Sequence, residues 1–273
     1  LEHIGAAFVR EVDPGEVIVI NKEGLQSSHW GGNNGHKAMC VFELIYFARP
    51  DSYVFGKSVN EVRTNLGGLL ARESGVEADA VVPIPDSGMC AALGYAENSG
   101  VPLKMGLIRN HYVGRTFIQP HQSVRGLKVK VKLNTVRSIL EGKRIILVDD
   151  SIVRGTTSKK IVSMIKAAGA REVHMRISCP PTVSPCYYGI DTPHRDELIA
   201  SEHSVEEIRD YMGADTLAYL SMDGLRQAVG DNHPNYCTAC YTKNYPVEPP
   251  RDTEAYRQLV LKMETSVEAA GDS

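Results

Sequence analysis

The clearest pattern in the chain is a short, unbroken apolar run that ends in two acidic residues. Ile145 to Val148 are all apolar, and Asp149 and Asp150 follow directly. A run of this length is typical of a parallel strand that is covered on both faces. A small, hydroxyl-rich stretch comes next. Apolar residues then recur at helical spacing from Ile161 to Ala168, and Gly169 is placed to end that helix.

The same two periodicities predict strands and helices along most of the chain. Residues 79–88 read as a second buried strand that ends in a polar turn, with a helix expected over 89–98. The other predicted elements are a helix with the apolar stripe Val62, Leu66, Leu69 and Leu70, a half-buried strand at 101–107, strands at 173–177 and 217–220, and a helix behind the capping box of Ser204 and Glu207. This alternation of strands and helices from about 40 to 230 predicts an α/β fold with a doubly wound parallel sheet.

The two ends of the chain have different patterns. Residues 5–10 and 16–20 are strand-like and flank Asp13-Pro14-Gly15, which predicts a β-hairpin, and a second turn follows at 21–24. Residues 27–36 are rich in glycine and asparagine, as a linker would be. Tyr256, Leu259, Val260 and Met263 suggest a C-terminal helix. We therefore divide the chain into a hairpin with linker (1–35), an α/β domain (36–230) and a C-terminal segment (231–273).

The loop behind the central strand has the chemistry of a phosphosugar site. Backbone N–H groups at a helix start can hold a phosphate dianion together with the hydroxyls of Thr156, Thr157 and Ser158. Asp149 and Asp150 can accept hydrogen bonds from vicinal hydroxyls, since ligands of open α/β sheets bind beyond the carboxyl ends of strands. The spacing is not that of a Walker loop. An isolated acidic pair would instead indicate two exposed carboxylates before a capped helix.

Composition narrows the class of protein. The 30 Lys and Arg residues against 33 Asp and Glu residues give a net charge of −3, so the chain lacks the excess of positive charge that favours nucleic-acid binding. No apolar run approaches the roughly 18 residues of a membrane span. We expect a cytoplasmic enzyme without nucleic-acid or membrane partners. The chain begins at Leu1 and not at Met, which suggests a fragment.

A basic segment and a cysteine pair supply two more candidate sites. Residues 109–134 are rich in Arg and Lys and have little periodicity, which favours a lid over a bound ligand, with a solvated basic face as the alternative. Cys237 and Cys240 form a CxxC motif, which favours metal or redox chemistry in an intracellular protein. Two ordinary core thiols are the alternative. Spacing alone leaves open which further ligands join them, and whether the metal is zinc or iron–sulfur.

Several motifs taken together resemble one enzyme family. The stretch from Val148 to Ser158, Val-Asp-Asp-Ser-Ile-Val-Arg-Gly-Thr-Thr-Ser, resembles the phosphoribosyl-pyrophosphate (PRPP) motif of type I phosphoribosyltransferases. Its form is that of the amidophosphoribosyltransferase family. The resemblance implies transfer of ammonia, taken from glutamine in the full-length enzyme, to C1 of PRPP, giving phosphoribosylamine and pyrophosphate. This is the first committed step of purine biosynthesis.

The resemblance also implies roles for individual residues. The substrate-binding set is Asp86, Ser87 and Gly88 for pyrophosphate, Asp149 and Asp150 for the ribose, and Ser151, Gly155, Thr156, Thr157 and Ser158 around the 5′-phosphate. Ser87, Asp149 and Asp150 would also bind Mg²⁺. Residues 114–120 and 129–134 resemble the flexible catalytic loop, which makes Arg115 and Lys132 the expected lid contacts.

The cysteines match the iron–sulfur branch of that family. Cys40, Cys186, Cys237 and Cys240 are then the implied ligands of a [4Fe–4S] cluster. We expect this cluster to be structural and oxygen-sensitive. Cys90 and Cys179 are left as small buried residues.

The family also bears on the nitrogen source and on partners. Residues 1–35 resemble the last strands of an N-terminal glutaminase domain, whose nucleophile is an N-terminal Cys. Because Leu1 stands first here, we expect ammonia-dependent activity only. Purine nucleotides are the expected feedback inhibitors, and a homo-oligomer, either dimer or tetramer, is the expected assembly. Two alternatives are a regulator of this fold that senses PRPP or nucleotides without catalysis, and an iron–sulfur electron carrier.

Overall fold

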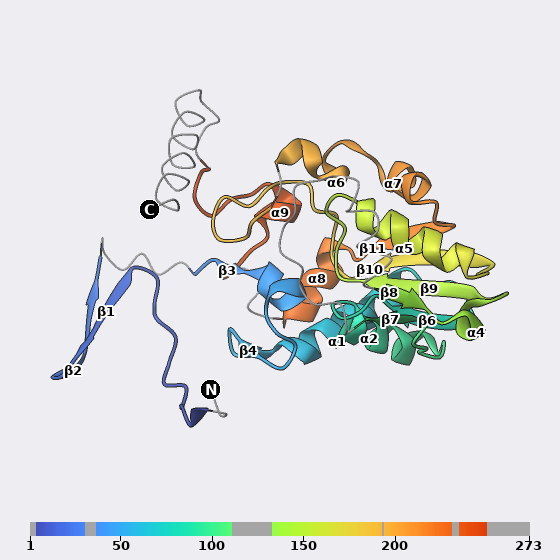
Figure 1. The fold of residues 1–273 in the computed structure, drawn as a ribbon. Helices are drawn as coiled ribbons and strands as arrows, with labels where there is room; N and C mark the ends of the chain where they lie inside the picture. Colours follow the sequence, from blue (N-terminus) through green and yellow to red (C-terminus); the bar gives the residue numbers. More distant parts are fainter. Residues whose placement is uncertain (1–3, 31–36, 111–132, 193, 231–234, 250–273) are drawn as a thin grey trace, which may run out of the picture.

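A parallel sheet of four strands forms the centre of the protein (Figure 1). The computed structural model describes residues 4–30, 37–110, 133–192, 194–230 and 235–249. The sheet has the order β11-β10-β9-β6 and consists of β6 (Ala80–Pro83), β9 (Arg144–Asp149), β10 (Glu172–Ile177) and β11 (Thr216–Tyr219). All three strand pairs are parallel. Ile145 to Val148 of β9 are fully buried, as their continuous apolar run predicts.

The strand order reverses between β6 and β9. Beyond the outer side of β6, Val81 forms a parallel bridge with Leu103, whereas β9 pairs with the inner side. The chain therefore runs from β6 outward to Leu103 and then returns past β6 to β9. In open α/β sheets, ligands bind beyond the carboxyl ends of the strands at such a switch point. The fold thus directs attention to the residues that follow β6 and β9.

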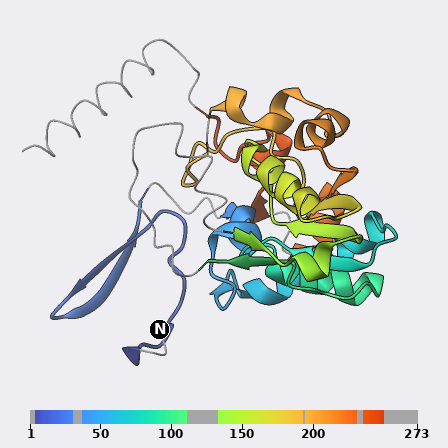
Figure 2. The ribbon, with the colours of Figure 1, turned by 45° about the vertical axis from the view of Figure 1, so that its right-hand side comes forward.

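Helices cover both faces of the sheet. Helices α1 (Val59–Glu73) and α2 (Met89–Ser99) lie on one face, and α5 (Thr156–Ala167) and α7 (Val205–Met212) lie on the other (Figures 1 and 2). The α1 and α2 backbones touch, since a Cβ added at Gly67 would lie 1.8 Å from the carbonyl oxygen of Ala91. The predicted α/β fold with a doubly wound parallel sheet is confirmed.

Helix starts follow the capping pattern of the sequence. Ser204 accepts a hydrogen bond from the Glu207 N–H, and the Glu207 carboxylate accepts one from the Ser204 N–H, which completes the predicted capping box of α7. Ser58 caps α1, and Ser221 caps α8 (Met222–Val229). Each cap satisfies an N–H group that has no partner within its own helix.

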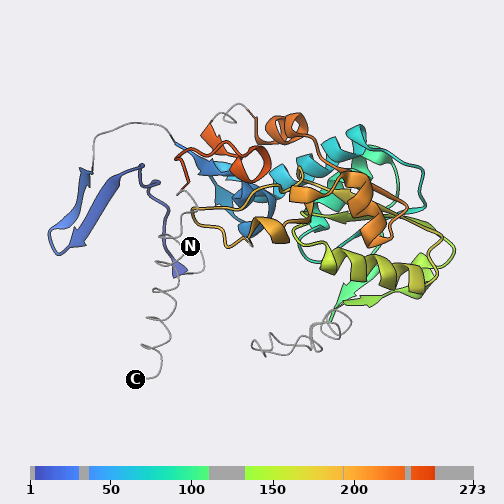
Figure 3. The same cartoon turned by 90° about the horizontal axis from the view of Figure 1, so that it is seen from above.

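The N-terminal hairpin is offset from its prediction. It consists of β1 (Glu16–Asn21) and β2 (Gly24–His29), and residues 6–12 form no strand. The turn is the one at 21–24, where the Asn21 side chain accepts a hydrogen bond from the Glu23 N–H and Gly24 has φ +113°. The prediction of a strand at 5–10 was therefore wrong, and β2 occupies the start of the predicted linker. The hairpin stands apart from the α/β body (Figure 3).

The strand predicted at 101–107 is also absent. Only Leu103 bridges to the sheet there, and Pro102 lacks the N–H that a longer ladder would need. The chain instead forms β7 (Leu107–Arg109), which pairs antiparallel with β8 (Leu133–Thr135). Of the alternating apolar residues, Val101 and Leu103 are half-buried, Met105 is exposed and Leu107 is fully buried in β7, so the alternation does not mark one strand.

The remaining elements are short. They are β3 (Met39–Cys40), the π-helix η2 (Glu43–Phe47), β4 (Tyr53–Val54), β5 (Lys57–Ser58), α4 (Arg137–Leu140), the 3-10 helix η3 (Arg195–Glu197), α6 (Ile199–Glu202), β12 (Tyr236–Cys237) and α9 (Ala239–Thr242). Arg115, Lys132 and the helix predicted around 256–263 lie outside the described residues. None of the helices in the described part of the chain combines the length and apolarity that crossing a membrane requires.

Candidate functional site: an acidic pair at the switch point and a cavity of four cysteines

The acidic pair lies at the carboxyl end of β9 and is buried. Asp149 is 8% exposed and Asp150 is 4% exposed. The Asp149 carboxylate accepts hydrogen bonds from the Asp150 N–H at 3.0 Å and from the Ser87 hydroxyl at 3.3 Å, and the Ser151 hydroxyl donates to Asp150. Burial, followed by the neighbouring Asp150 carboxylate, raises the pKa of Asp149 well above its usual range. Such a pair gains stability from a cation or from hydroxyl donors.

The loop behind β6 brings Ser87 to this pair. Gly88 is the N-cap residue of α2, and its N–H donates to the carbonyl oxygen of Ile84 at 2.9 Å. A Cβ at Gly88 would lie 2.4 Å from the carbonyl oxygen of Val148, so only glycine lets the loop approach β9 this closely. The structure therefore places the predicted residues Ser87, Gly88 and Asp149 together at the switch point.

Asp86, the remaining member of this loop, points toward a cation. Its carboxylate forms an ion pair with Arg109 of β7, and both side chains are at least half exposed. A contact in open solvent of this kind contributes little stability. It does keep a guanidinium beside the predicted pyrophosphate-binding loop.

The hydroxyl-rich loop opens α5. Gly155 has φ +71° and precedes the first helical residue, so its backbone takes a left-handed conformation that other residues adopt only under strain. Thr156 and Thr157 are exposed, and Ser158 is 5% exposed. The exposed helix start offers N–H groups to an anion together with two of the three predicted hydroxyls, those of Thr156 and Thr157. The Ser158 side chain is turned into the protein.

A buried arginine near the pair went unnoticed in the sequence. Arg63 of α1 is 5% exposed and donates to the backbone carbonyls of Leu44 at 3.0 Å and Ala48 at 2.8 Å. Burial lowers the pKa of its guanidinium, while the nearby Cys90 and Asp150 act in the opposite direction. Arg63 is adjacent to Val62 and lies three residues before Leu66, on the same side of α1 as the predicted apolar stripe. A cation on the apolar side of a helix was the sequence feature that could have pointed to it.

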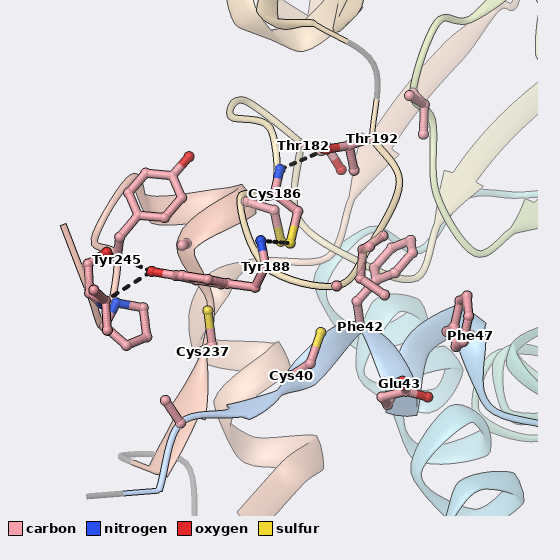
Figure 4. A pocket seen from close by; sticks show the side chains of 18 residues that line it. Cys40, Phe42, Glu43, Phe47, Thr182, Cys186, Tyr188, Thr192, Cys237 and Tyr245 are labelled. Carbon is pink, nitrogen blue, oxygen red and sulfur yellow. Dashed lines mark hydrogen bonds between the residues drawn. The ribbon is translucent and has the colours of Figure 1, made fainter. Parts of the chain in front are cut away.

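The four predicted cluster cysteines line one cavity of about 340 Å³ (Figure 4). Strands β3 and β12 are parallel, with Cys40 opposite Cys237. Cys240 lies in α9, and Cys186 comes from the segment after β10. All six cysteines of the chain are free thiols, and neither Cys90 nor Cys179 lines this cavity.

The four thiols influence one another electrostatically. Burial, and then the neighbouring thiols, raise the pKa of Cys240 to about 12, and the same causes raise the pKa of Cys40. The neighbours that act on Cys240 are Cys40, Cys237 and Cys186. Bound positive charge would favour the thiolate forms, which burial disfavours. Among the described residues, however, no three His, Cys, Asp or Glu side chains are grouped closely enough to ligate one metal ion.

Two buried residues, Cys179 and Tyr241, lie between the acidic pair and the cysteine cavity. Cys179 is fully buried and follows β10, whose Ile177 lies opposite Asp149. Burial, followed by the Asp150 carboxylate, raises the pKa of the Cys179 thiol well above its usual range. Tyr241, directly after Cys240, interacts with Cys179, although its hydroxyl lacks hydrogen-bond geometry to any described group. The acidic pair and the cysteine cavity are thus neighbours in space.

The fold and the acidic pair define a class of protein. Residues 57–195 match the family model described as the phosphoribosyl transferase domain, and the chain belongs to that family. The match covers β6, β9, the loops that follow them and Cys186.

More specific similarity is to amidophosphoribosyltransferases. The chain is 56% identical over 249 residues to the chloroplastic enzyme of Vigna aconitifolia and 54% identical over 254 residues to the Bacillus subtilis enzyme, covering 91% and 92% of this chain. These stretches are 51% and 53% of the relatives, so the chain spans about half of their length. It also superposes on the B. subtilis glutamine PRPP amidotransferase complexed with ADP and GMP, with a TM-score of 0.84 and 53% identity over 92% of this chain and 56% of that one.

Proposed function

We propose that this chain transfers ammonia to C1 of PRPP, giving phosphoribosylamine and pyrophosphate. One observation carries the proposal: Asp149 and Asp150 end β9 at the switch point, with Ser87 of the neighbouring loop bonded to Asp149. Two carboxylates suit the two vicinal hydroxyls of a ribose, and the exposed start of α5 suits its 5′-phosphate. Similarity to amidophosphoribosyltransferases selects ammonia as the acceptor.

The reaction depends more on how the enzyme positions PRPP and ammonia than on proton transfer by a side chain. The nitrogen lone pair of ammonia attacks C1, the bond from C1 to the pyrophosphate oxygen breaks, and the amine then loses a proton to water. Ammonia is already a nucleophile, so no strong base is required. Asp149 and Asp150 would orient the ribose. Thr156 and Thr157 would hold the phosphate with their hydroxyls, Gly155 and Ser158 would do so through their backbone N–H groups, and Ser151 would lie beside them. The predicted lid contacts Arg115 and Lys132 would exclude water.

The donor set near the leaving group suits Mg²⁺. Hydroxyl and carboxylate oxygens are its preferred protein ligands, and Ser87 and Asp149 are already in contact. With Asp150 they would hold the ion, whose charge would neutralise the pyrophosphate as it leaves. Asp86 and Gly88 complete the loop that we propose for pyrophosphate.

The cysteine cavity suits a [4Fe–4S] cluster, which would place this chain in the iron–sulfur branch of the family. A single zinc ion needs four donors at about 2.3 Å, but no three acidic, His or Cys side chains of the described chain are grouped for one ion. Cys40, Cys186, Cys237 and Cys240 instead surround a cavity, and each could ligate a different iron. Such a cluster would tie the segment before α1 to the C-terminal segment.

The remaining proposals concern nitrogen source and regulation. We propose ammonia as donor for this chain by itself and glutamine as its source in the whole protein. Because the B. subtilis relative is complexed with ADP and GMP, purine nucleotides are proposed as feedback ligands. A dimer or tetramer and a cytoplasmic location stay predictions, and several relatives are chloroplastic.

The test is anaerobic release of pyrophosphate from PRPP and Mg²⁺, with ammonium, glutamine or neither as donor. Release with ammonium but not with glutamine would support the proposed activity and the proposal that this chain by itself uses only ammonia. Release with glutamine would contradict the ammonia-only proposal. An iron-loaded chain that binds PRPP but releases no pyrophosphate with either donor would favour a regulator that senses PRPP.

A further inference from the structure

Cys186 differs from the other three cavity cysteines in how its backbone is held. Cys40 and Cys237 are paired between β3 and β12, and Cys240 lies in α9. Cys186 lies in residues 184–188, which form neither helix nor strand. The Cys186 N–H donates to the Thr192 hydroxyl at 2.6 Å, and the Ser184 N–H donates to the Cys240 carbonyl oxygen at 3.1 Å. Tertiary contacts of this kind, and not a helix or strand, therefore hold the segment that carries its thiol.

Tyr245 supports this segment from one side. Its hydroxyl donates to the carbonyl oxygen of Pro185 at 2.7 Å and is hydrogen-bonded to the Ser184 hydroxyl. Pro185 directly precedes Cys186, so one phenol holds the backbone on the approach to the thiol. The Tyr245 ring also packs edge-on against Tyr187, with ring centroids 5.3 Å apart.

Tyr188 supports the segment from the other side. Its N–H donates to the Cys186 sulfur at 3.4 Å, and its hydroxyl forms a reciprocal pair with the backbone of Val247 (Figure 4). In that pair the hydroxyl donates to the Val247 carbonyl at 2.7 Å and accepts from its N–H at 3.1 Å. Residues 245–247 are therefore hydrogen-bonded to the chain on both sides of Cys186.

We propose that Tyr188 and Tyr245 are positioning residues for Cys186, which keep its thiol directed into the cavity by fastening residues 184–188 to residues 245–247. The proposal rests on the cluster-binding role given above. Partners that orient a metal ligand are typically worth about 10–100-fold in affinity for the metal site. The N–H to sulfur bond also disperses charge on a Cys186 thiolate.

Two conservative variants test it, Tyr245→Phe and Tyr188→Phe, each of which keeps the ring and removes the hydroxyl. Tyr53→Phe is the matched control, because Tyr53 is 79% exposed and does not line the cavity. In anaerobically loaded protein, visible absorbance of the cluster is followed after exposure to air. We expect its decay to be about tenfold faster in both variants and unchanged in the control.

A second readout needs no cluster. In iron-free protein, alkylation of Cys186 is followed by mass spectrometry, with Cys90 as the internal reference. Faster labelling of Cys186 alone is expected in both variants. If both variants label Cys186 and lose absorbance at the rates of the parent protein, the positioning role is overturned. Absence of iron in the parent would instead overturn the cluster, while the labelling comparison would still decide the role of the two tyrosines.

Discussion

The acidic pair and the cysteine cavity are built in opposite ways. Asp149, Asp150 and the hydroxyls of α5 come from one continuous strand, loop and helix, and only the loop with Ser87 is added from elsewhere. The cavity draws its four cysteines from segments far apart in the chain, joined by a two-residue strand pair, a short helix and an irregular segment. The first site has the central sheet behind it, and the second has little regular structure.

Because of this difference, the two sites should respond differently to substitutions and to loss of metal. The ends of β6 and β9 are held by a fully hydrogen-bonded parallel ladder, so the acidic site needs no metal to keep its shape. At the cavity, the four cysteines come from a two-residue strand pair, a short helix and an irregular segment, so bound metal would contribute much of its stability. Variants at the two sites should therefore separate activity from cluster content.

The largest expected effect is at the cavity. Cys240→Ser removes a buried ligand, and iron per chain together with visible absorbance should fall to background, as measured by iron analysis after anaerobic purification. Cys90→Ser is the matched control, because Cys90 lies outside the cavity and accepts a hydrogen bond from Asn60 that serine can also accept. Full iron content in Cys240→Ser would contradict the proposed ligand set.

The next effect is at the acidic pair. Asp150→Asn keeps the side-chain shape but removes a charge, and pyrophosphate release should fall about 100-fold, within the range seen when one transition-state contact is lost. Iron content should be unchanged. Asp223→Asn, whose side chain is 91% exposed, serves as the control. Loss of iron in Asp150→Asn would show that the two sites are not separable.

A smaller effect compares one glycine from each site. The Cβ of Gly88→Ala would lie 2.4 Å from the Val148 carbonyl, and the forced backbone shift should cost about 1–3 kcal/mol of unfolding free energy. Gly189 lines the cavity and has nothing within 4 Å of an added Cβ. Gly189→Ala should therefore stay within about 0.5 kcal/mol. Denaturant unfolding measures both, and equal values would contradict the close approach at Gly88.

The smallest effect lies in β10, which both sites share as a support. Burial, and then the charge of Arg176, lower the pKa of His174 below its usual 6.5. The unfolded chain therefore binds a proton that the folded chain does not, and unfolding free energy should fall as pH drops below about 6.5 toward the folded pKa. His174→Gln should flatten this dependence, measured as unfolding midpoints between pH 5 and 8. If the pH dependence of the unfolding midpoint is the same in His174→Gln, groups other than His174 cause it.

Sequence reasoning worked where a signal was local. The run 145–148, the capping box of α7 and the loop after β6 were all placed correctly, because strand burial, helix capping and turn chemistry depend on neighbouring residues. It failed at 5–10, where the strand-like residues pair with no described strand, and at 101–107, where only Leu103 bridges to β6 and Pro102 cannot extend the ladder. Sequence reasoning also missed the buried Arg63 and the hydrogen bonds of Tyr188 and Tyr245 on either side of Cys186, because the partners of these side chains are distant in the chain.

Local patterns were enough to predict the α/β fold and the strand, loop and helix that carry Asp149, Asp150 and the hydroxyls of α5, because those features lie within a few residues of one another. Family resemblance, and not spacing, selected the four cysteines. Three contacts came from tertiary structure alone: Ser87 bonds to Asp149, the four cysteines line one cavity, and Cys179 interacts with both the acidic pair and Cys240. Those contacts depend on strand order and on packing between segments, which no local pattern records.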